Sequence, residues 1–129
     1  MRRRVIDVGL ALGYAGLIFF LSAQSSFPVP KGIWTFDKVL HFTEYGVFAF
    51  LICRAIRPAD LHSSKETSAL VIAVILASLY GVSDEIHQYF VPGRSSEVLD
   101  AVADAAGSVM GAGAFVFHRR RGSRVRGGT

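Results

Sequence analysis

Four apolar segments, each long enough to cross a lipid bilayer as a helix, take up most of this chain of 129 residues. A helix needs about 20 residues to span the hydrocarbon of a membrane, with a range of roughly 17–25. The segments cover residues 5–23, 39–56, 69–89 and 99–118. The hydrophobic fraction of 51% and the mean hydropathy of +0.40 are high for a soluble domain of this size. The sequence therefore predicts an all-α fold, a four-helix transmembrane bundle.

Basic residues are concentrated at one set of segment ends. Eleven of the 14 Lys and Arg residues precede the first segment, separate the second from the third, or follow the fourth. Loops rich in Lys and Arg stay on the cytoplasmic side of a membrane. We therefore expect both termini in the cytoplasm, and an even number of spans agrees. The Arg- and Gly-rich residues 119–129 are expected to form a disordered cytoplasmic tail after a membrane domain over residues 1–118.

Three other kinds of protein are disfavoured. The sequence pI of about 9.6 could indicate nucleic-acid binding, but basic residues beside apolar spans are typical of topology signals and of contacts with anionic lipid. A cleaved secretory signal is disfavoured because the first apolar run is too long and Leu21 is a poor residue at a cleavage site. The single cysteine, Cys53, excludes an internal disulfide.

Acidic residues are concentrated at the opposite segment ends. Seven of the ten lie there: Asp37, Glu44, Asp84, Glu85, Glu97, Asp100 and Asp104. A carboxylate placed at full depth in a membrane costs about 2–3 kcal/mol or more. Chains keep such groups where they pair, bind a ligand or do chemistry. The sequence therefore predicts a polar pocket on the extracytoplasmic side.

The spacing of polar residues places several of them on shared helix faces. Asp37, His41 and Tyr45 fall on one face of the second segment, because residues four apart lie one turn apart. Asp100 and Asp104 share a face of the fourth segment in the same way. Small residues at 103, 107 and 111 allow a close helix contact, which would draw both aspartates into the bundle.

These motifs resemble those of the VanZ-like family of small integral membrane proteins. The matching stretches are residues 21–25, residues 36–42 with Tyr45, residues 85–94, and Asp100 and Asp104 with two glycines behind them. The resemblance covers about residues 14–115. Two positions depart from the family pattern: Asp104 stands where Asn is usual, and His87 stands where an apolar residue is usual.

The resemblance implies a multi-pass protein of the bacterial plasma membrane that acts in the cell envelope. The founding member of the family is tied to low-level resistance to teicoplanin, a lipid-bearing glycopeptide antibiotic. We therefore expect the partners to be membrane lipid and an amphiphilic or lipid-linked anionic ligand, with no nucleic acid. Nine residues are carried over as site residues: Asp37, Lys38, His41, Tyr45, Glu85, Gln88, Arg94, Asp100 and Asp104.

Two sets of roles are expected within these nine. His41, Glu85, Asp100 and Asp104 are the candidates for acid–base catalysis, because crowded carboxylates cannot all be ionised at once. The other five are candidates for ligand binding, with Arg94 and Lys38 holding an anionic group. His41 is equally compatible with a buried structural imidazole, and Arg94 with a clamp on Glu85 or Asp100.

Three functions stay open. The first is binding of, or protection against, an amphiphilic ligand. The second is an intramembrane enzyme that hydrolyses or transfers a group on a lipid-linked substrate. No cofactor is expected: a divalent metal on His41, Glu85, Asp100 and Asp104 is conceivable, but no H-E-x-x-H or paired-Cys spacing is present. The third, a cation-coupled carrier, is disfavoured because no polar path continues to the cytoplasmic ends.

Overall fold

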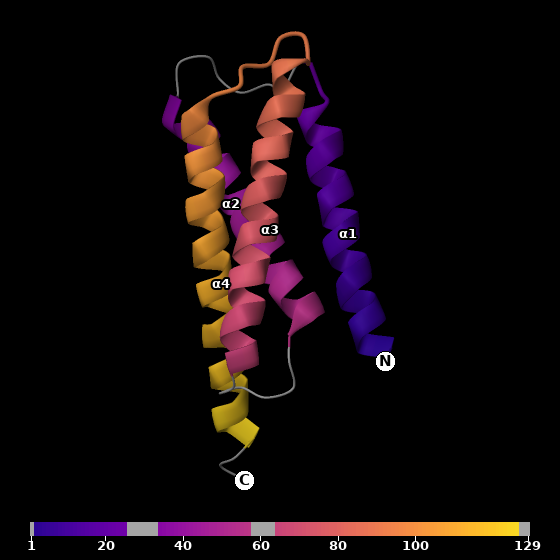
Figure 1. Ribbon diagram of the computed structural model, residues 1–129, viewed down its shortest axis with the longest axis vertical. Helices are drawn as coiled ribbons and strands as arrows, with labels where there is room; N and C mark the ends of the chain where they lie inside the picture. Colours follow the sequence, from indigo (N-terminus) through magenta and orange to yellow (C-terminus); the bar gives the residue numbers. More distant parts are fainter. Residues whose placement is uncertain (1, 26–33, 58–63, 127–129) are drawn as a thin grey trace.

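The computed structural model of this chain describes residues 2–25, 34–57 and 64–126 as a bundle of four helices (Figure 1). The helices are α1 (Arg2–Ser22), α2 (Trp34–Ile56), α3 (Ser64–Tyr89) and α4 (Val98–Arg126). No strand occurs in the described residues. Each helix is long and apolar enough to cross a membrane. The predicted all-α bundle of four membrane-capable helices is confirmed.

Successive helices run in opposite directions, so α1 begins and α4 ends at the same end of the bundle (Figure 1). We call this the basic end, and the other, where α2 and α4 begin, the acidic end. Helices α2 and α4 therefore run parallel, and their mutual contact is the most extensive in the bundle. Helix α1 packs against α2 and sparingly against α3, but not against α4 within the described ranges.

Glycines bring α2 and α4 into backbone contact. A Cβ added at Gly107 would overlap the carbonyl oxygen of Phe42, and a Cβ at Gly111 would overlap that of Gly46. Side chains of ordinary size would hold two helices 8–10 Å apart, whereas small residues let the backbones meet. The small-residue spacing of the fourth segment thus serves the close contact that the sequence predicts.

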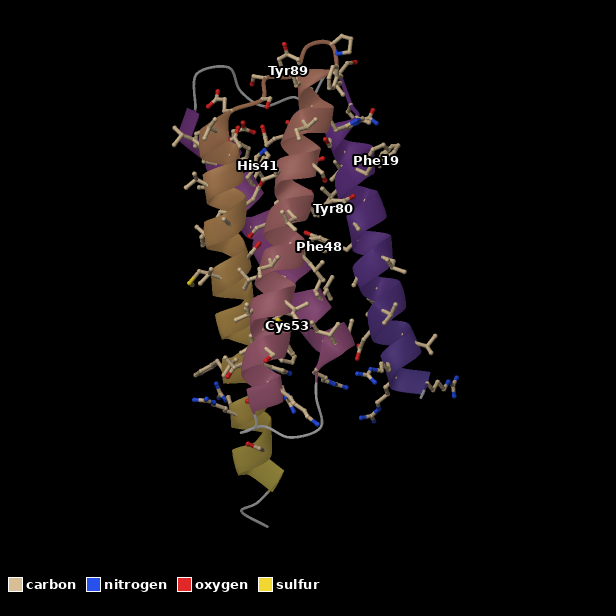
Figure 2. The ribbon with its side chains drawn as sticks, viewed as in Figure 1. Phe19, His41, Phe48, Cys53, Tyr80 and Tyr89 are labelled. Atoms are coloured by element: carbon tan, nitrogen blue, oxygen red, sulfur yellow. The ribbon has the colours of Figure 1, made fainter. Side chains whose placement is uncertain are left out.

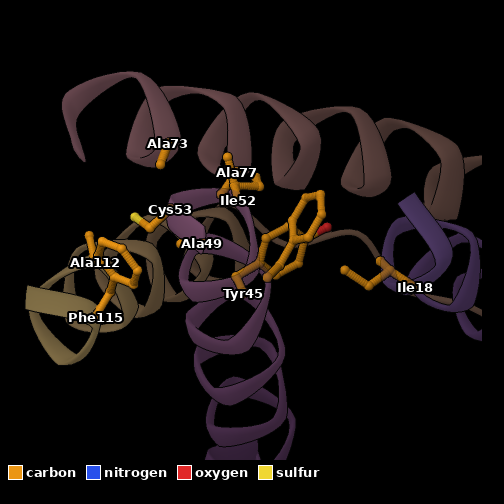
Figure 3. Close-up of a cluster of buried hydrophobic side chains, with 10 residues drawn as sticks. Ile18, Tyr45, Ala49, Ile52, Cys53, Ala73, Ala77, Ala112 and Phe115 are labelled. Atoms are coloured by element: carbon orange, nitrogen blue, oxygen red, sulfur yellow. The ribbon is translucent and has the colours of Figure 1, made fainter. Parts of the chain in front are cut away.

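The distribution of apolar and polar side chains between surface and interior is the reverse of that in a soluble protein. Large apolar residues such as Phe20, Leu79 and Phe117 are more than half exposed, while Asp100 and Asp104 are buried. An apolar core still fills the middle of the bundle (Figure 3). At its edge, the ring of Phe48 packs against that of Tyr80 at 5.2 Å between centroids. An apolar exterior around buried charge is the arrangement expected of helices surrounded by lipid.

Ion pairs fasten the basic end. The buried carboxylate of Asp7 on α1 lies 2.6 Å from a guanidinium nitrogen of Arg54 on α2. Arg119 of α4 lies 3.6 Å from Glu66 of α3.

Helix α4 does not stop at residue 118 but continues to Arg126, which differs from the predicted disordered tail over residues 119–126. Arginine has a high helix propensity and cations stabilise a helix C-terminus; residues 127–129 lie outside the described residues.

Candidate functional site

Ionisable side chains from three helices converge inside the bundle near its acidic end. Five of them are at most 6% exposed: His41 of α2, Asp84 and Glu85 of α3, and Asp100 and Asp104 of α4. Figure 2 shows His41 in the part of the bundle nearest the acidic end. Buried charges are costly unless they are paired, so the partners of each group decide what the site can do.

His41, Glu85 and Asp104 form one group, which we call the His41 cluster. The Nδ1 atom of His41 lies 3.0 Å from Oδ1 of Asp104 and 3.8 Å from Oε1 of Glu85. Gly81 of α3 makes room for this group, because a Cβ there would lie 2.6 Å from Oδ2 of Asp104. Each of three helices thus contributes one ionisable side chain to the same point.

Lys38, Glu97 and Asp100 form a second group, the Lys38 cluster. The ammonium of Lys38 donates to Oδ1 of Asp100 at 2.6 Å and to Oε2 of Glu97 at 2.9 Å. The backbone N–H of Glu97 donates to Oε2 of Glu85 at 3.0 Å, which links the two clusters. Lys38 therefore neutralises carboxylates of the protein itself, and its role toward an anionic ligand stays a prediction.

A cavity of about 250 Å³ borders His41. One wall is formed by α1, with the apolar side chains of Tyr14, Ile18 and Leu21. The opposite wall is formed largely by polar residues of α2 and α3 and by Arg94: Asp37, His41, Thr43, Glu44, Asp84, Gln88 and Arg94. Ser22 of α1 and Leu40 of α2 also line the cavity, so its lining is mainly apolar on the α1 side and mainly polar on the side of α2 and α3.

A model of the VanZ/LLP1 family matches residues 8–119 of the chain. The chain belongs to this family. The match contains both clusters and every residue that lines the cavity. Comparisons with curated proteins and with solved structures gave no match. The resemblance read from the sequence is confirmed, and together with the four apolar helices it indicates a multi-pass membrane protein of the VanZ family.

The predicted site residues of this VanZ-family protein fall at three places. His41, Glu85 and Asp104 meet in the His41 cluster, and Lys38 and Asp100 meet beside it. Asp37, Gln88 and Arg94 line the cavity, where Gln88 donates to Oδ2 of Asp84 at 3.0 Å. Tyr45 lies apart, fully buried in the apolar core with its ring edge-on to Phe48.

Of the two roles considered for Arg94, the structure bears on the clamp to Glu85 or Asp100. It lines the cavity, but among the described residues it forms no ion pair with Glu85 or Asp100. Those carboxylates are instead engaged by the backbone of Glu97 and by Lys38. Within the described ranges, Arg94 therefore borders the cavity as a cation without an ion pair to a carboxylate.

Several residues of the site were not selected from the sequence. Glu44 and Asp84 line the cavity, and Glu97 is the second partner of Lys38. All three belong to the seven acidic residues that the sequence places at this set of segment ends, and that grouping was the sequence signal for them. Ser22 on the α1 wall belongs to the 21–25 stretch that matches the family. Gly81 could not be recognised from the sequence, because the space it leaves matters only through Asp104 on the helix that packs against it.

Proposed function

We propose that this VanZ-family protein lies in the bacterial plasma membrane with its acidic end toward the outside and both termini in the cytoplasm. The distribution of cations supports this orientation, since only Lys31, Lys38 and Arg94 of the 14 Lys and Arg residues belong to the acidic end and its connections. Cytoplasmic loops carry the excess of Lys and Arg in multi-pass proteins. The cavity then opens toward the extracytoplasmic face.

Its function is to bind the head group of an envelope amphiphile in that cavity. The observation that carries this proposal is the two-sided lining, in which Ile18 and Leu21 of α1 face a polar wall from α2 and α3. A ligand that is apolar at one end and polar at the other satisfies both walls. Because α1 packs only sparingly on α3, that side of the bundle is the natural route for an acyl chain.

The lining also defines the head group. Arg94 suits an anionic group, such as a phosphate or a carboxylate, which a guanidinium binds through paired hydrogen bonds. Asp37, Glu44 and Asp84 accept hydrogen bonds and suit hydroxyl or amino groups on the same ligand. Lipid-linked envelope precursors and lipid-bearing glycopeptides combine these features. Protection against teicoplanin would follow from capture of such a ligand.

Replacing Arg94 with Gln tests the proposal. A hydrogen bond to a charged group contributes about 1.5–3 kcal/mol, so we expect R94Q to weaken binding of teicoplanin to the purified protein by about tenfold or more. Titration in lipid nanodiscs measures the affinity. The matched control is Arg121→Gln, which removes an exposed cation near the other end of the bundle. Equal affinities of R94Q and the unchanged protein, or equal binding of deacylated teicoplanin, would contradict the proposal.

A second candidate, an intramembrane enzyme, is favoured by one observation. His41 lines the cavity while its Nδ1 atom is held 3.0 Å from Asp104. A carboxylate that orients an imidazole in this way leaves Nε2 as the atom that exchanges a proton with a substrate. On this hypothesis His41→Gln would slow turnover of a lipid phosphate by about 10²–10⁴-fold while binding persists. If the unchanged protein shows no turnover of lipid phosphates, the protein is a binder only.

A further inference from the structure

The His41 cluster contains carboxylate oxygens that no other described residue satisfies. Glu85 is 6% exposed and Asp104 is fully buried. Within the described residues, Oε1 of Glu85 and Oδ2 of Asp104 have no hydrogen-bond partner. Oε1 of Glu85 is nevertheless directed at the cluster, 3.8 Å from Nδ1 of His41. Such unsatisfied buried groups are rare and call for an explanation.

The charges of the cluster match those of a divalent cation. The two carboxylates carry two negative charges when ionised, and a metal-binding imidazole must be neutral. One divalent ion therefore balances the cluster. Glu97 and Asp100 next to it already have a cation, the ammonium of Lys38 at 2.9 and 2.6 Å, whereas no Lys or Arg among the described residues pairs with Glu85 or Asp104.

The distances between the donor atoms also fit such an ion. One donor atom each from His41, Glu85 and Asp104 lies within 4.8 Å of the other two. Ligands about 2.0–2.1 Å from a tetrahedral ion lie about 3.3 Å from one another. The separations from Nδ1 of His41, 3.0 Å to Asp104 and 3.8 Å to Glu85, bracket that value, so both carboxylates lie at distances from the imidazole that one ion can bridge.

A neighbouring set of donors is a poorer candidate. Asp37, His41 and Asp100 also lie within 4.8 Å of one another. Asp100, however, accepts a hydrogen bond from Lys38 at 2.6 Å, so a second cation there would have to displace the ammonium. In the His41 cluster an ion would displace only the proton shared by Nδ1 of His41 and Oδ1 of Asp104, not a Lys ammonium.

We propose that His41, Glu85 and Asp104 form a binding site for one divalent metal ion of the zinc type. One imidazole nitrogen and two carboxylate oxygens are a ligand set that Zn²⁺ accepts, and three protein ligands leave a fourth position open. Hard ions such as Mg²⁺ and Ca²⁺ prefer oxygen ligands in larger number and bind more weakly here. The site goes beyond the proposed ligand binding and does not depend on which amphiphile enters the cavity.

Calorimetric titration with Zn²⁺ alone tests the proposal. The purified, tag-free protein in detergent is first treated with a chelator and then titrated, and Co²⁺ is used in parallel because its visible spectrum reports tetrahedral coordination. We expect one ion per chain. Asp104→Asn and Glu85→Gln should each weaken binding by at least about tenfold, since even the groups that only orient metal ligands contribute 10–100-fold. His118→Gln, an exposed histidine on α4, and Asp37→Asn should leave binding within about twofold.

Three results would overturn the proposal. The first is no saturable Zn²⁺ binding by the unchanged protein, which is decisive even if a variant fails to fold. The second is a Zn²⁺ affinity in the Asp104→Asn and Glu85→Gln variants equal to that of the unchanged protein. The third is loss of binding in Asp37→Asn instead, which would assign the ion to the neighbouring set. Because the readout is metal binding itself, failure here leaves the teicoplanin titration as a separate test of the proposed function.

Discussion

Replacing Lys38 with Met should lower the free energy of unfolding by about 3 kcal/mol, the lower end of the cost expected when one partner of a buried ion pair is removed, because Asp100 is buried while Lys38 is 17% exposed. Lys38 is the cation that neutralises Asp100, which is 1% exposed, and it also holds Glu97. Without the ammonium, Asp100 must either stay charged in a buried position or become protonated. Unfolding of the detergent-solubilised protein by a denaturing detergent measures the change.

Two further variants separate loss of the charge pair from loss of the side chain. The double variant Lys38→Met with Asp100→Leu removes both charges and should recover most of the stability, because buried ion pairs are often replaceable by apolar residues. Lys65→Met removes an exposed lysine from α3 and should change stability by less than about 0.5 kcal/mol. If K38M is no less stable than K65M, the Lys38 cluster does not stabilise the fold.

Replacing Gly111 with Val should separate α2 from α4 and cost about 3 kcal/mol, the upper part of the range for overpacking. A Cβ at this position would overlap the carbonyl oxygen of Gly46, and a backbone atom cannot move aside as a side-chain end can. The same unfolding measurement reports the loss. Because the two helices carry Lys38, His41 and both aspartates of α4, the variant should also abolish ligand binding.

The matched control is Gly113→Val on the same helix. A Cβ at Gly113 meets no atom within 4 Å, so the same substitution there changes helix propensity and volume without a clash. We expect G113V to stay within about 1 kcal/mol of the unchanged protein. Equal losses in G111V and G113V would show that the backbone contact between α2 and α4 is not the source of stability.

Much of the fold could be predicted because segment length and the distribution of charge are local properties of the sequence. Four apolar segments imply four helices, and Asp100 and Asp104 share a helix face whatever packs against them. Acids at one set of helix ends imply one polar region. The helical continuation of α4 to Arg126 was missed, because the contact of Arg119 with Glu66 of α3 is not visible in composition.

The pairing within the site could not be predicted, because it depends on how the helices are rotated against one another. Helices α2 and α4 lie parallel in one register, in which Lys38 meets Asp100 and His41 meets Asp104 one turn deeper. That register is set by Gly107 and Gly111 against the backbone of α2. Sequence spacing identified the faces but not their partners, so the pairing of Lys38 with Asp100 and Glu97 was not predicted.

The whole functional proposal depends on an acidic end that faces the outside of the cell. Cysteine labelling tests this orientation most directly. Ser95 lies exposed at the acidic end and Ser123 lies exposed at the basic end, while the native Cys53 is 1% exposed and serves as the unlabelled background. With a membrane-impermeant maleimide on intact cells, we predict that Ser95→Cys is labelled and that Ser123→Cys is labelled only after the membrane is opened. Labelling of Ser123→Cys but not Ser95→Cys on intact cells would contradict an extracytoplasmic cavity.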